Sequence, residues 1–174
     1  LSGADGSSTT LVGVSGGLLS AIEAVGGGDK VVINDGSIIA IMSPRAGATS
    51  IADADGVNIG SEPDAKSYSS IAMNNNRAYG IHVGDGNDEV INNGDITVEN
   101  RVNLNRSRAI SRPGQGQEAI DAFAEAFARI NGVYGYGIRA DGGDNFLVND
   151  GLIDVIVSPY SEASTNSTGR GFDG

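Results

Sequence analysis

The chain of 174 residues contains no cysteine, no tryptophan, four phenylalanines and one histidine. Because cysteine is absent, a disulfide framework and a cysteine-ligated zinc site are excluded. The scarcity of aromatic residues argues against a long groove that stacks sugar rings. Positive charge is also scarce, with 11 Lys and Arg against 22 Asp and Glu, and this balance argues against nucleic acid and anionic membranes as partners. No apolar run reaches the length of a membrane span.

Glycine and small aliphatic residues are abundant instead. The chain has 27 glycines, and 39% of its residues are hydrophobic, which is too many for a disordered chain. Alanine, valine and isoleucine must fill most of the core, and these residues suit closely stacked strands, while glycine suits sharp turns. The first residue is Leu1 and no signal peptide is evident, so we expect a processed or excised piece.

One pattern occurs three times, in repeat cores at residues 21–42, 80–100 and 137–157. Its shared centre is Asn-[Asp/Asn]-Gly-x-Ile, in which x is a variable residue. The anchors Asn34 and Asn92 are 58 positions apart, and Asn92 and Asn149 are 57 apart. Passing from Asn149 through the C-terminus and on from residue 1 to Asn34 covers 59 positions. Such a period indicates a repeat architecture, which we expect to form a single domain over residues 1–174.

Each repeat core resembles three short strands separated by tight turns. Apolar and polar residues alternate with a period of two in the first strand, as in a half-buried strand. The sequence therefore predicts an all-β fold, a right-handed parallel β-helix or solenoid built from three repeats of 57–59 residues. Three short strands make one coil of such a solenoid. Each repeat is expected to hold three coils, or two longer ones, which gives a rod on the order of 40 Å long. The isoleucines expected to point inward are Ile22, Ile38, Ile81, Ile96, Ile138 and Ile153.

The segment Glu118–Ile130 fits two interpretations. A short helix would place Phe123 and Phe127 on one apolar face at a spacing of four, among good helix formers. A strand would instead point the alternating alanines inward, and the equal length of the repeats favours it. Composition favours the helix, so both structures stay open at this point.

The polar positions of the repeat are expected to be structural. An asparagine at a turn can satisfy backbone groups of the bend, and a glycine two positions later permits the turn. His82 invites a catalytic role, but Glu23 and Arg139 occupy the same place in the other copies, which is typical of a solvated face. The predicted turn residues are Asn34, Gly36, Asn92, Gly94, Asn149 and Gly151.

The stretch Gly84–Val90 resembles the calcium-binding nonapeptide of RTX proteins, in which carboxylates and turn carbonyls of successive coils hold Ca²⁺. The resemblance implies a calcium ion near Asp85 and Asp88, or near Asp141 and Asp144. The alternative is a polar β-turn without an ion, because the other two copies lack the spacer before the aspartate. No other cofactor is expected.

The longer pattern at residues 80–98, echoed at 21–40 and 137–155, resembles the β-helix repeats of bacterial surface proteins of the autotransporter and adhesin type. The resemblance implies an extracellular location at the cell surface and a structural or adhesive role, with surface glycans as one class of partner. It supplies no site residues.

The expected function is that of a non-catalytic repeat protein that assembles head to tail into a filament, or forms a segment of a longer surface fibre. An uncapped solenoid exposes unpaired backbone groups at both ends, so its main partner is another copy of itself. Residues 10–13 are expected to match residues 70–73 of the next repeat. The alternative is a carbohydrate-binding or polysaccharide-cleaving β-helix, with acids such as Asp53 and Asp55.

Overall fold

The computed structural model describes residues 6–15, 17–54, 65–113 and 122–167. Every regular element in these ranges is a β-strand, so the all-β prediction is confirmed. Nothing in the described ranges forms a helix of the length and apolarity that crossing a membrane requires.

The strands form four separate sheets, and every pairing is parallel. The largest sheet contains β1 (Gly6–Ser15), β2 (Leu18–Ala24), β6 (Ala65–Val83) and β10 (Ala122–Ala140). The next two contain β3 (Val31–Asn34), β7 (Glu89–Asn92) and β11 (Phe146–Asn149), and then β4 (Ile38–Met42), β8 (Ile96–Asn100) and β12 (Ile153–Val157). The last contains β5 (Arg45–Ala54), β9 (Asn103–Pro113) and β13 (Tyr160–Ser167).

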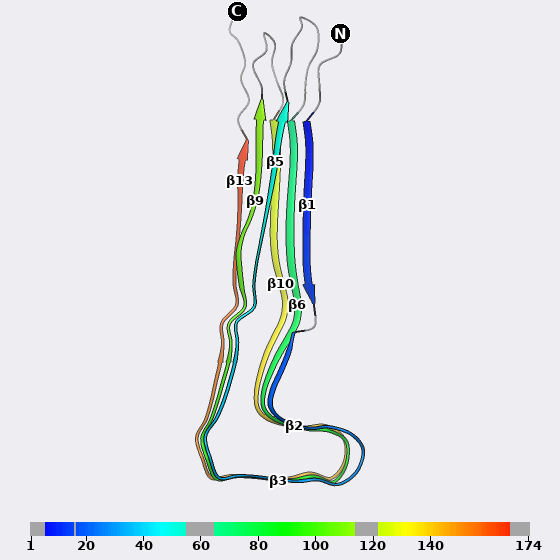
Figure 1. Cartoon of the computed structure of the whole chain (residues 1–174), viewed down its shortest axis with the longest axis vertical. Helices are drawn as coiled ribbons and strands as arrows, with labels where there is room; N and C mark the ends of the chain where they lie inside the picture. Colours follow the sequence, from blue (N-terminus) through cyan, green and yellow to red (C-terminus); the bar gives the residue numbers. More distant parts are fainter. Residues whose placement is uncertain (1–5, 16, 55–64, 114–121, 168–174) are drawn as a thin grey trace, which may run out of the picture.

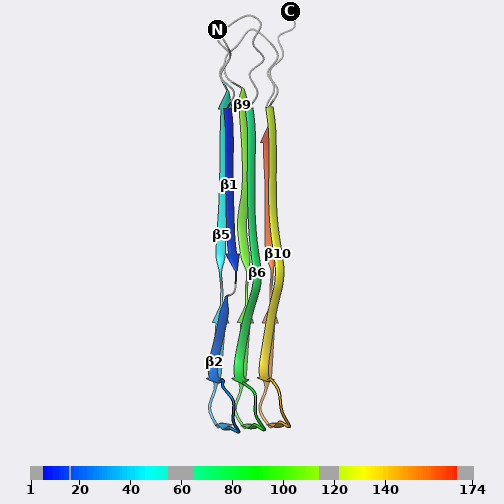
Figure 2. The same cartoon turned by 90° about the vertical axis from the view of Figure 1, so that its right-hand side faces the viewer.

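The chain passes through these sheets in three stacked layers, which Figure 2 shows side by side. We call β1 to β5 the first layer, β6 to β9 the middle layer and β10 to β13 the third layer. In each layer two long sides run close together as a narrow shaft and then separate around a wider foot, whose base is β3, β7 or β11 (Figure 1). The middle layer pairs with both neighbours, and each outer layer leaves one edge open.

The predicted number of coils is wrong. Asn34 pairs with Asn92, and Asn92 pairs with Asn149, so one whole repeat of 57 or 58 residues makes one layer. The three short strands of a repeat core lie around the foot, and the rest of the repeat forms the shaft. Three layers at about 4.8 Å per step are roughly 14 Å thick. The molecule is therefore long within the plane of each layer and thin along the direction in which the layers stack.

The foot contains the main apolar core. Residues from all three layers meet there, and the fully buried ones belong to the middle layer, such as Ile81 and Val98. All six isoleucines predicted to point inward belong to this core or pack against it, so that prediction is confirmed: Ile22, Ile38, Ile81, Ile96, Ile138 and Ile153.

The part of the shaft nearest the foot holds a second apolar core around Ile71, Met73 and Leu104, and small residues fill the part farther from the foot. Ala65, Ser67 and Ser69 of β6 face inward, and serines of the opposite sheet meet them. Ser107 Oγ donates to the carbonyl oxygen of Ser69 at 2.9 Å, and Ser67 Oγ donates to the carbonyl oxygen of Ser50 at 2.8 Å. Side chains this small let two sheets approach closely, as in the dry interfaces between paired sheets of a steric zipper.

The shaft joins the foot at a backbone irregularity. Asn75 in β6 has φ of 53°, and Gly132 in β10 has φ of 70°, both in the left-handed region. These two residues lie at equivalent places, between the paired positions 74/131 and 76/133. A single left-handed residue of this kind bends a strand and re-aims the side chains after it.

The helix interpretation of Glu118–Ile130 is wrong for the part that the structure describes. Residues from Ala122 onward form β10, in register with Ala65 onward in β6. Phe123 and Phe127 point outward and are exposed, while Ala124 and Ala126 between them alternate toward the shaft interior, beside the buried Ser67 and Ser69 of β6. Packing between the two sheets therefore overrides helix propensity. Residues 118–121 lie outside the described ranges.

The expected match of residues 10–13 with residues 70–73 is off by one position. Thr10 pairs with Ser69, and Val12 pairs with Ile71. In a strand a slip of one residue exchanges the inner and outer faces, so the observed register is the one that turns Val12 toward the core.

Candidate functional site

The layers are held together at the foot by ladders of side chains that repeat from one layer to the next. The first ladder is made of the anchor asparagines. Asn34 Nδ2 donates to Asn92 Oδ1, and Asn92 Nδ2 donates to Asn149 Oδ1, each at 2.6 Å. Each amide also donates to the carbonyl oxygen two residues later, on Gly36, Gly94 or Gly151. These are backbone groups of the bend, so the asparagines act as structural turn residues.

The glycines of this turn have a steric reason. A Cβ at Gly94 would lie 1.9 Å from the carbonyl oxygen of Gly36, and one at Gly151 would lie 2.1 Å from that of Gly94. The turns of successive layers therefore stack backbone on backbone, with no room for a side chain.

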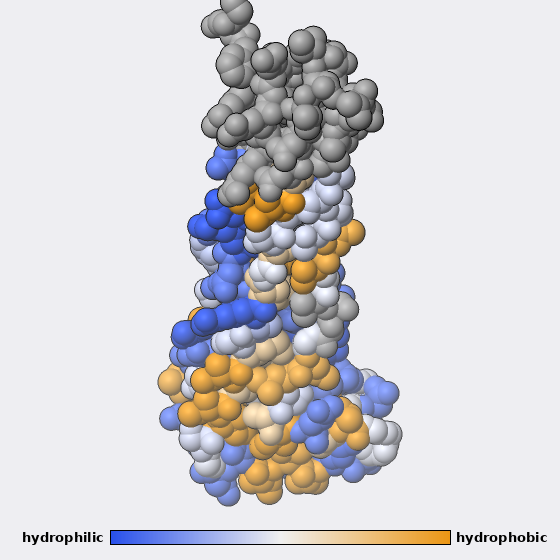
Figure 3. All heavy atoms as spheres, turned by 45° about the horizontal axis from the view of Figure 1, so that its top comes forward, coloured by the Kyte–Doolittle hydropathy of each residue, from blue (hydrophilic) through white to orange (hydrophobic). Residues whose placement is uncertain are grey.

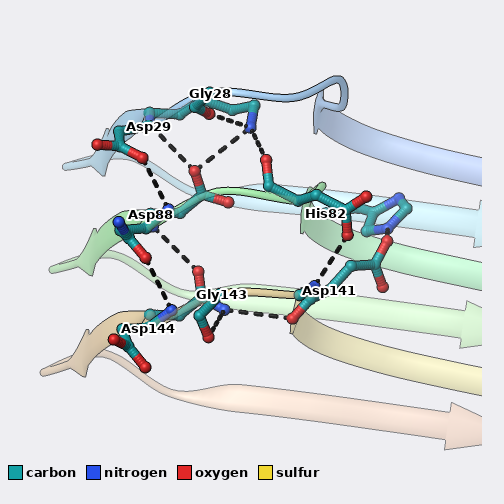
Figure 4. A network of polar contacts seen from close by, with 12 residues as sticks. Gly28, Asp29, His82, Asp88, Asp141, Gly143 and Asp144 are labelled. Atoms are coloured by element: carbon teal, nitrogen blue, oxygen red, sulfur yellow. Dashed lines mark hydrogen bonds and ion pairs between the residues drawn. The ribbon is translucent and has the colours of Figure 1, made fainter.

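A second ladder lies in the turn between the first and second strands of the foot (Figure 4). The backbone N–H of Asn87 donates to Asp29 Oδ1 at 2.9 Å, and that of Asp144 donates to Asn87 Oδ1 at 3.0 Å. The buried carboxylate of Asp88 accepts from the backbone N–H of Lys30 at 3.0 Å and lies 3.3 Å from its ammonium group. These contacts again join one layer to the next.

An aromatic and charged cluster covers the outer face of the largest sheet at the foot. The ring of Tyr79 lies 4.7 Å from His82 and 5.1 Å from Tyr136. The guanidinium of Arg139 lies 5.5 Å from both tyrosine rings and donates to the Tyr79 hydroxyl at 3.1 Å. Asp141 binds the other side of Arg139 at 2.8 Å.

Asp141 receives two partners in this cluster. His82 Nε2 lies 3.0 Å from its second carboxylate oxygen. Hydrogen bonds from Arg139, and then from His82, lower the pKa of the Asp141 carboxyl, and the bond to Asp141 raises the pKa of the Arg139 guanidinium. His82 does point outward, but only 12% of its side chain is exposed. The expectation of a freely solvated position is therefore wrong, because Tyr79 and Asp141 cover the ring.

The predicted calcium residues do not converge in the described part of the chain. Asp85 accepts a hydrogen bond from the backbone N–H of Gly142, and Asp88 forms an ion pair with Lys30. Asp141 forms an ion pair with Arg139, and the backbone N–H of Asp144 donates to Asn87 of the middle layer. Among the described residues there is no group of three His, Cys, Asp or Glu side chains that could hold a metal. The calcium site stays a prediction. Of the predicted acids, Asp55 lies outside the described ranges.

The two outer layers leave interior positions open at their edges. Val98 in the middle layer is 0% exposed, whereas Val155 in the same column of the third layer is 37% exposed. Val90 is 0% exposed, and its third-layer counterpart Leu147 is 48% exposed. A hollow also opens between the two shaft sheets on the third layer, lined by Ile130, Gly132, Val133, Val157, Pro159 and Ser161.

Apolar residues also gather over the foot on the face seen in Figure 3. Large exposed side chains of the first layer belong to the foot strands and turns, namely Leu18, Val25, Val31, Ile33, Ile39 and Ile41. The open edges and their apolar margins are therefore the most distinctive surface of the described residues.

Sequence reasoning did not find the serine contacts in the shaft or the tyrosine cluster. The shaft left a signal in the alternating Ala and Ser of residues 65–69 and 107–111, which is the small-residue pattern of closely packed sheets. The tyrosines left a weaker one, because Tyr79 and Tyr136 occupy equal places in the repeat and pair in register.

No protein-family model, curated protein or solved structure matches the chain.

Proposed function

We propose that this chain is a non-catalytic structural module, a right-handed parallel β-solenoid of three turns that stacks head to tail on identical copies. The product is a filament or a segment of a longer extracellular fibre. The observation that supports this proposal best is the pair of open edges, where the third layer of one copy and the first layer of the next carry the same columns of side chains. Parallel strands with unpaired backbone groups are a template for the addition of another strand.

The middle layer shows what a covered layer requires. Its interior positions Val90, Ile96 and Val98 are fully buried because a layer lies on each side. On the third layer the corresponding positions are open, and a first layer placed there would bring Val32, Ile38 and Ala40 over them in the register that the chain already uses internally.

Two side-chain contacts would continue across this junction. Asn149 Nδ2 would reach Asn34 Oδ1 of the next copy, as Asn92 Nδ2 reaches Asn149 Oδ1 within the chain. Glu23 pairs in register with His82, and His82 with Arg139, so stacking places Arg139 at the strand position adjacent to Glu23 of the next copy. Opposite charges at directly adjacent strand positions stabilise the pairing.

The geometry of the cluster of Asp141, Arg139 and His82 fits a structural role. The carboxylate of Asp141 is bound to Arg139, and a carboxyl whose pKa is lowered by an ion pair is a poor proton donor or acceptor at neutral pH. His82 is the third member of this cluster and is packed on the Tyr79 ring.

The test of stacking is a concentration series followed by sedimentation velocity and electron microscopy. The wild type is expected to form fibres with an axial repeat of roughly 14 Å, three strand spacings. Val155→Lys places a charge in a column that stacking must bury, and it is expected to stay monomeric. Asp154→Lys, on the outward-facing neighbour, is the matched control and is expected to stack. A wild type that remains monomeric at high concentration contradicts the proposal.

The extracellular location rests on the resemblance of the repeats to surface proteins. It predicts that an antibody against the folded chain labels intact host cells without permeabilisation. Labelling only after permeabilisation contradicts an extracellular fibre while leaving the stacking test unaffected.

A second candidate function, glycan binding, is favoured by the tyrosine cluster. Tyr134 and Tyr136 lie 6.4 Å apart in a stacked arrangement, Arg77 lies over the Tyr134 ring at 5.7 Å, and Tyr134 is 41% exposed. An exposed aromatic face beside a guanidinium group can stack on a sugar ring. Screening against a panel of oligosaccharides tests this role, with Tyr134→Ala expected to abolish any binding and Tyr160→Ala, an exposed tyrosine elsewhere, expected to retain it.

A further inference from the structure

Two ladders in the turns of the foot share an unusual charge pattern. Positions 29, 87 and 144 carry Asp, Asn and Asp, and positions 35, 93 and 150 also carry Asp, Asn and Asp. In both ladders the neutral residue belongs to the middle layer, and the carboxylates belong to the two outer layers. Within one chain, therefore, no two carboxylates of these ladders are neighbours.

In the ladder of positions 35, 93 and 150 a middle-layer amide donates to a neighbouring carboxylate, whereas in the ladder of positions 29, 87 and 144 the contacts join backbone N–H groups to side-chain oxygens. Asn87 accepts from the backbone of Asp144 and donates its own N–H to Asp29, and Asn93 Nδ2 donates to Asp35 Oδ1 at 2.7 Å. An amide can donate to the carboxylate beside it, whereas a second carboxylate cannot. The middle layer thus separates like charges that the period would otherwise bring together.

Stacking removes that separation. At a junction between copies, Asp144 of one chain lies beside Asp29 of the next, and Asp150 beside Asp35, at the strand spacing of about 4.8 Å. From these juxtapositions we propose that the junction is gated by charge: two pairs of like-charged carboxylates weaken stacking at low ionic strength, and screening by salt strengthens it. This inference rests on the proposed stacking function and concerns its regulation.

Neighbouring charges do not neutralise these pairs. The ammonium group of Lys30 donates to the carbonyl oxygens of Gly28 and Asp85 and to the carboxylate of Asp88. These contacts direct it toward the middle layer of the same chain, away from the junction. Among the described residues, the other charged groups near the first turn are the acids Asp85 and Asp88 and the ion pair of Asp141 with Arg139, whose charges offset each other; Asp95 lies near the second turn.

One attractive pair, Glu23 with Arg139, opposes the two repulsive ones. Each copy also carries a net charge of −11, so the long-range interaction between copies is repulsive as well. Salt screens the attractive and the repulsive contributions alike, and the repulsive ones predominate.

The test compares the wild type with two double variants, each of which loses two negative charges at different positions of the third layer. Asp144→Asn with Asp150→Asn copies the middle-layer residues onto the third layer. The backbone N–H groups of these two aspartates donate to Asn87 Oδ1 and to the carbonyl oxygen of Asn92, and the substitutions leave those bonds in place. The control, Glu125→Gln with Asp154→Asn, removes two charges from the same layer at outward positions that face Thr9 and Ile39 across the junction.

The critical concentration for fibre formation is measured by light scattering for all three proteins at about 0.01 M and about 0.15 M salt, where the screening length falls from about 30 Å to about 8 Å. At low salt the Asp144→Asn/Asp150→Asn variant is expected to assemble at about one tenth of the concentration that the control needs, because each carboxylate pair weakens stacking by roughly a factor of three. At the higher salt the gap is expected to shrink to about fourfold, because a screening length of about 8 Å removes only part of a repulsion that acts over about 4.8 Å.

Two results would overturn the gate. If the wild type forms fibres but the variant and the control coincide at low salt, or if their gap does not change with salt, the gate is wrong and stacking stands. If no protein forms fibres at any salt concentration, the proposed stacking fails and the gate fails with it.

Discussion

The predicted contact between Glu23 of one copy and Arg139 of the next can be tested by exchanging charges. Two single variants are made, Glu23→Arg and Arg139→Glu. Stacked on itself, the first places two arginines at the junction and the second places two glutamates there. A mixture of both variants restores an opposite pair at every junction, because each variant's third layer then faces the complementary first layer of the other.

The size of the effect follows from the middle layer. His82 occupies the covered equivalent of position 23, and only 12% of its side chain is exposed, so a stacked pair is screened less than a fully exposed one. An exposed ion pair contributes up to about 1 kcal/mol. Changing attraction into repulsion reverses the sign, so we expect a loss of about 1.5 kcal/mol per junction, which is about a tenfold higher critical concentration.

The assay is sedimentation of fibres over a concentration series, with each variant alone and with an equimolar mixture. Arg139→Glu also removes the bond to Asp141, so thermal unfolding of each variant is recorded to confirm that the monomer is folded. Each variant alone is expected to assemble poorly, and the mixture is expected to assemble like the wild type with alternating subunits. If the mixture assembles no better than the single variants, the register of the proposed junction is wrong.

Three further predictions concern the chain itself. Asn92→Ala removes a buried amide with partners in both neighbouring layers, so the free energy of unfolding is expected to fall by about 2–4 kcal/mol, and Asn149→Ala, at the open edge, by about 1 kcal/mol, both measured in urea. Asn75→Val forces a branched residue into the left-handed region and is expected to cost about 1–2 kcal/mol in the same assay, whereas Asn75→Gly is expected to be neutral or stabilising. The pKa of Asp141 is lowered in the folded state, chiefly by Arg139, so its contribution to stability is present above its ordinary value of 3.8 and is lost as the pH falls through the lower folded value. The difference in unfolding free energy between the wild type and Asp141→Asn is accordingly expected to be constant near pH 7 and to close below about pH 4, and a difference that persists in stronger acid contradicts the ion pair.

The repeat period and the alternation of the repeat core were sufficient to predict the strands of the foot and its inward isoleucines. Both are local patterns, and each side chain's face follows from its place in a strand. The equal positions of Asn34, Asn92 and Asn149 also pointed to a common turn, which the structure shows as a continuous ladder.

The number of layers could not be obtained in the same way. A period of 57–59 residues is compatible with one long turn or several short ones, and the choice depends on how the irregular half of the repeat packs. That half forms the shaft, where pairing of two sheets through Ala and Ser side chains decides the path of the chain. For residues 122–130, the local preference for helix was outweighed by these contacts, which join residues far apart in sequence.

The pairing register has a consequence for how the chain folds. The described strands of one layer pair only with strands 56 to 59 positions away, so within these ranges an isolated repeat has no strand ladder to form. The first productive event must close a loop of nearly sixty residues and align two layers at once, at a high entropic cost. We therefore expect slow initiation, after which the third repeat adds to an existing edge rapidly, as in other arrays with nearest-neighbour coupling.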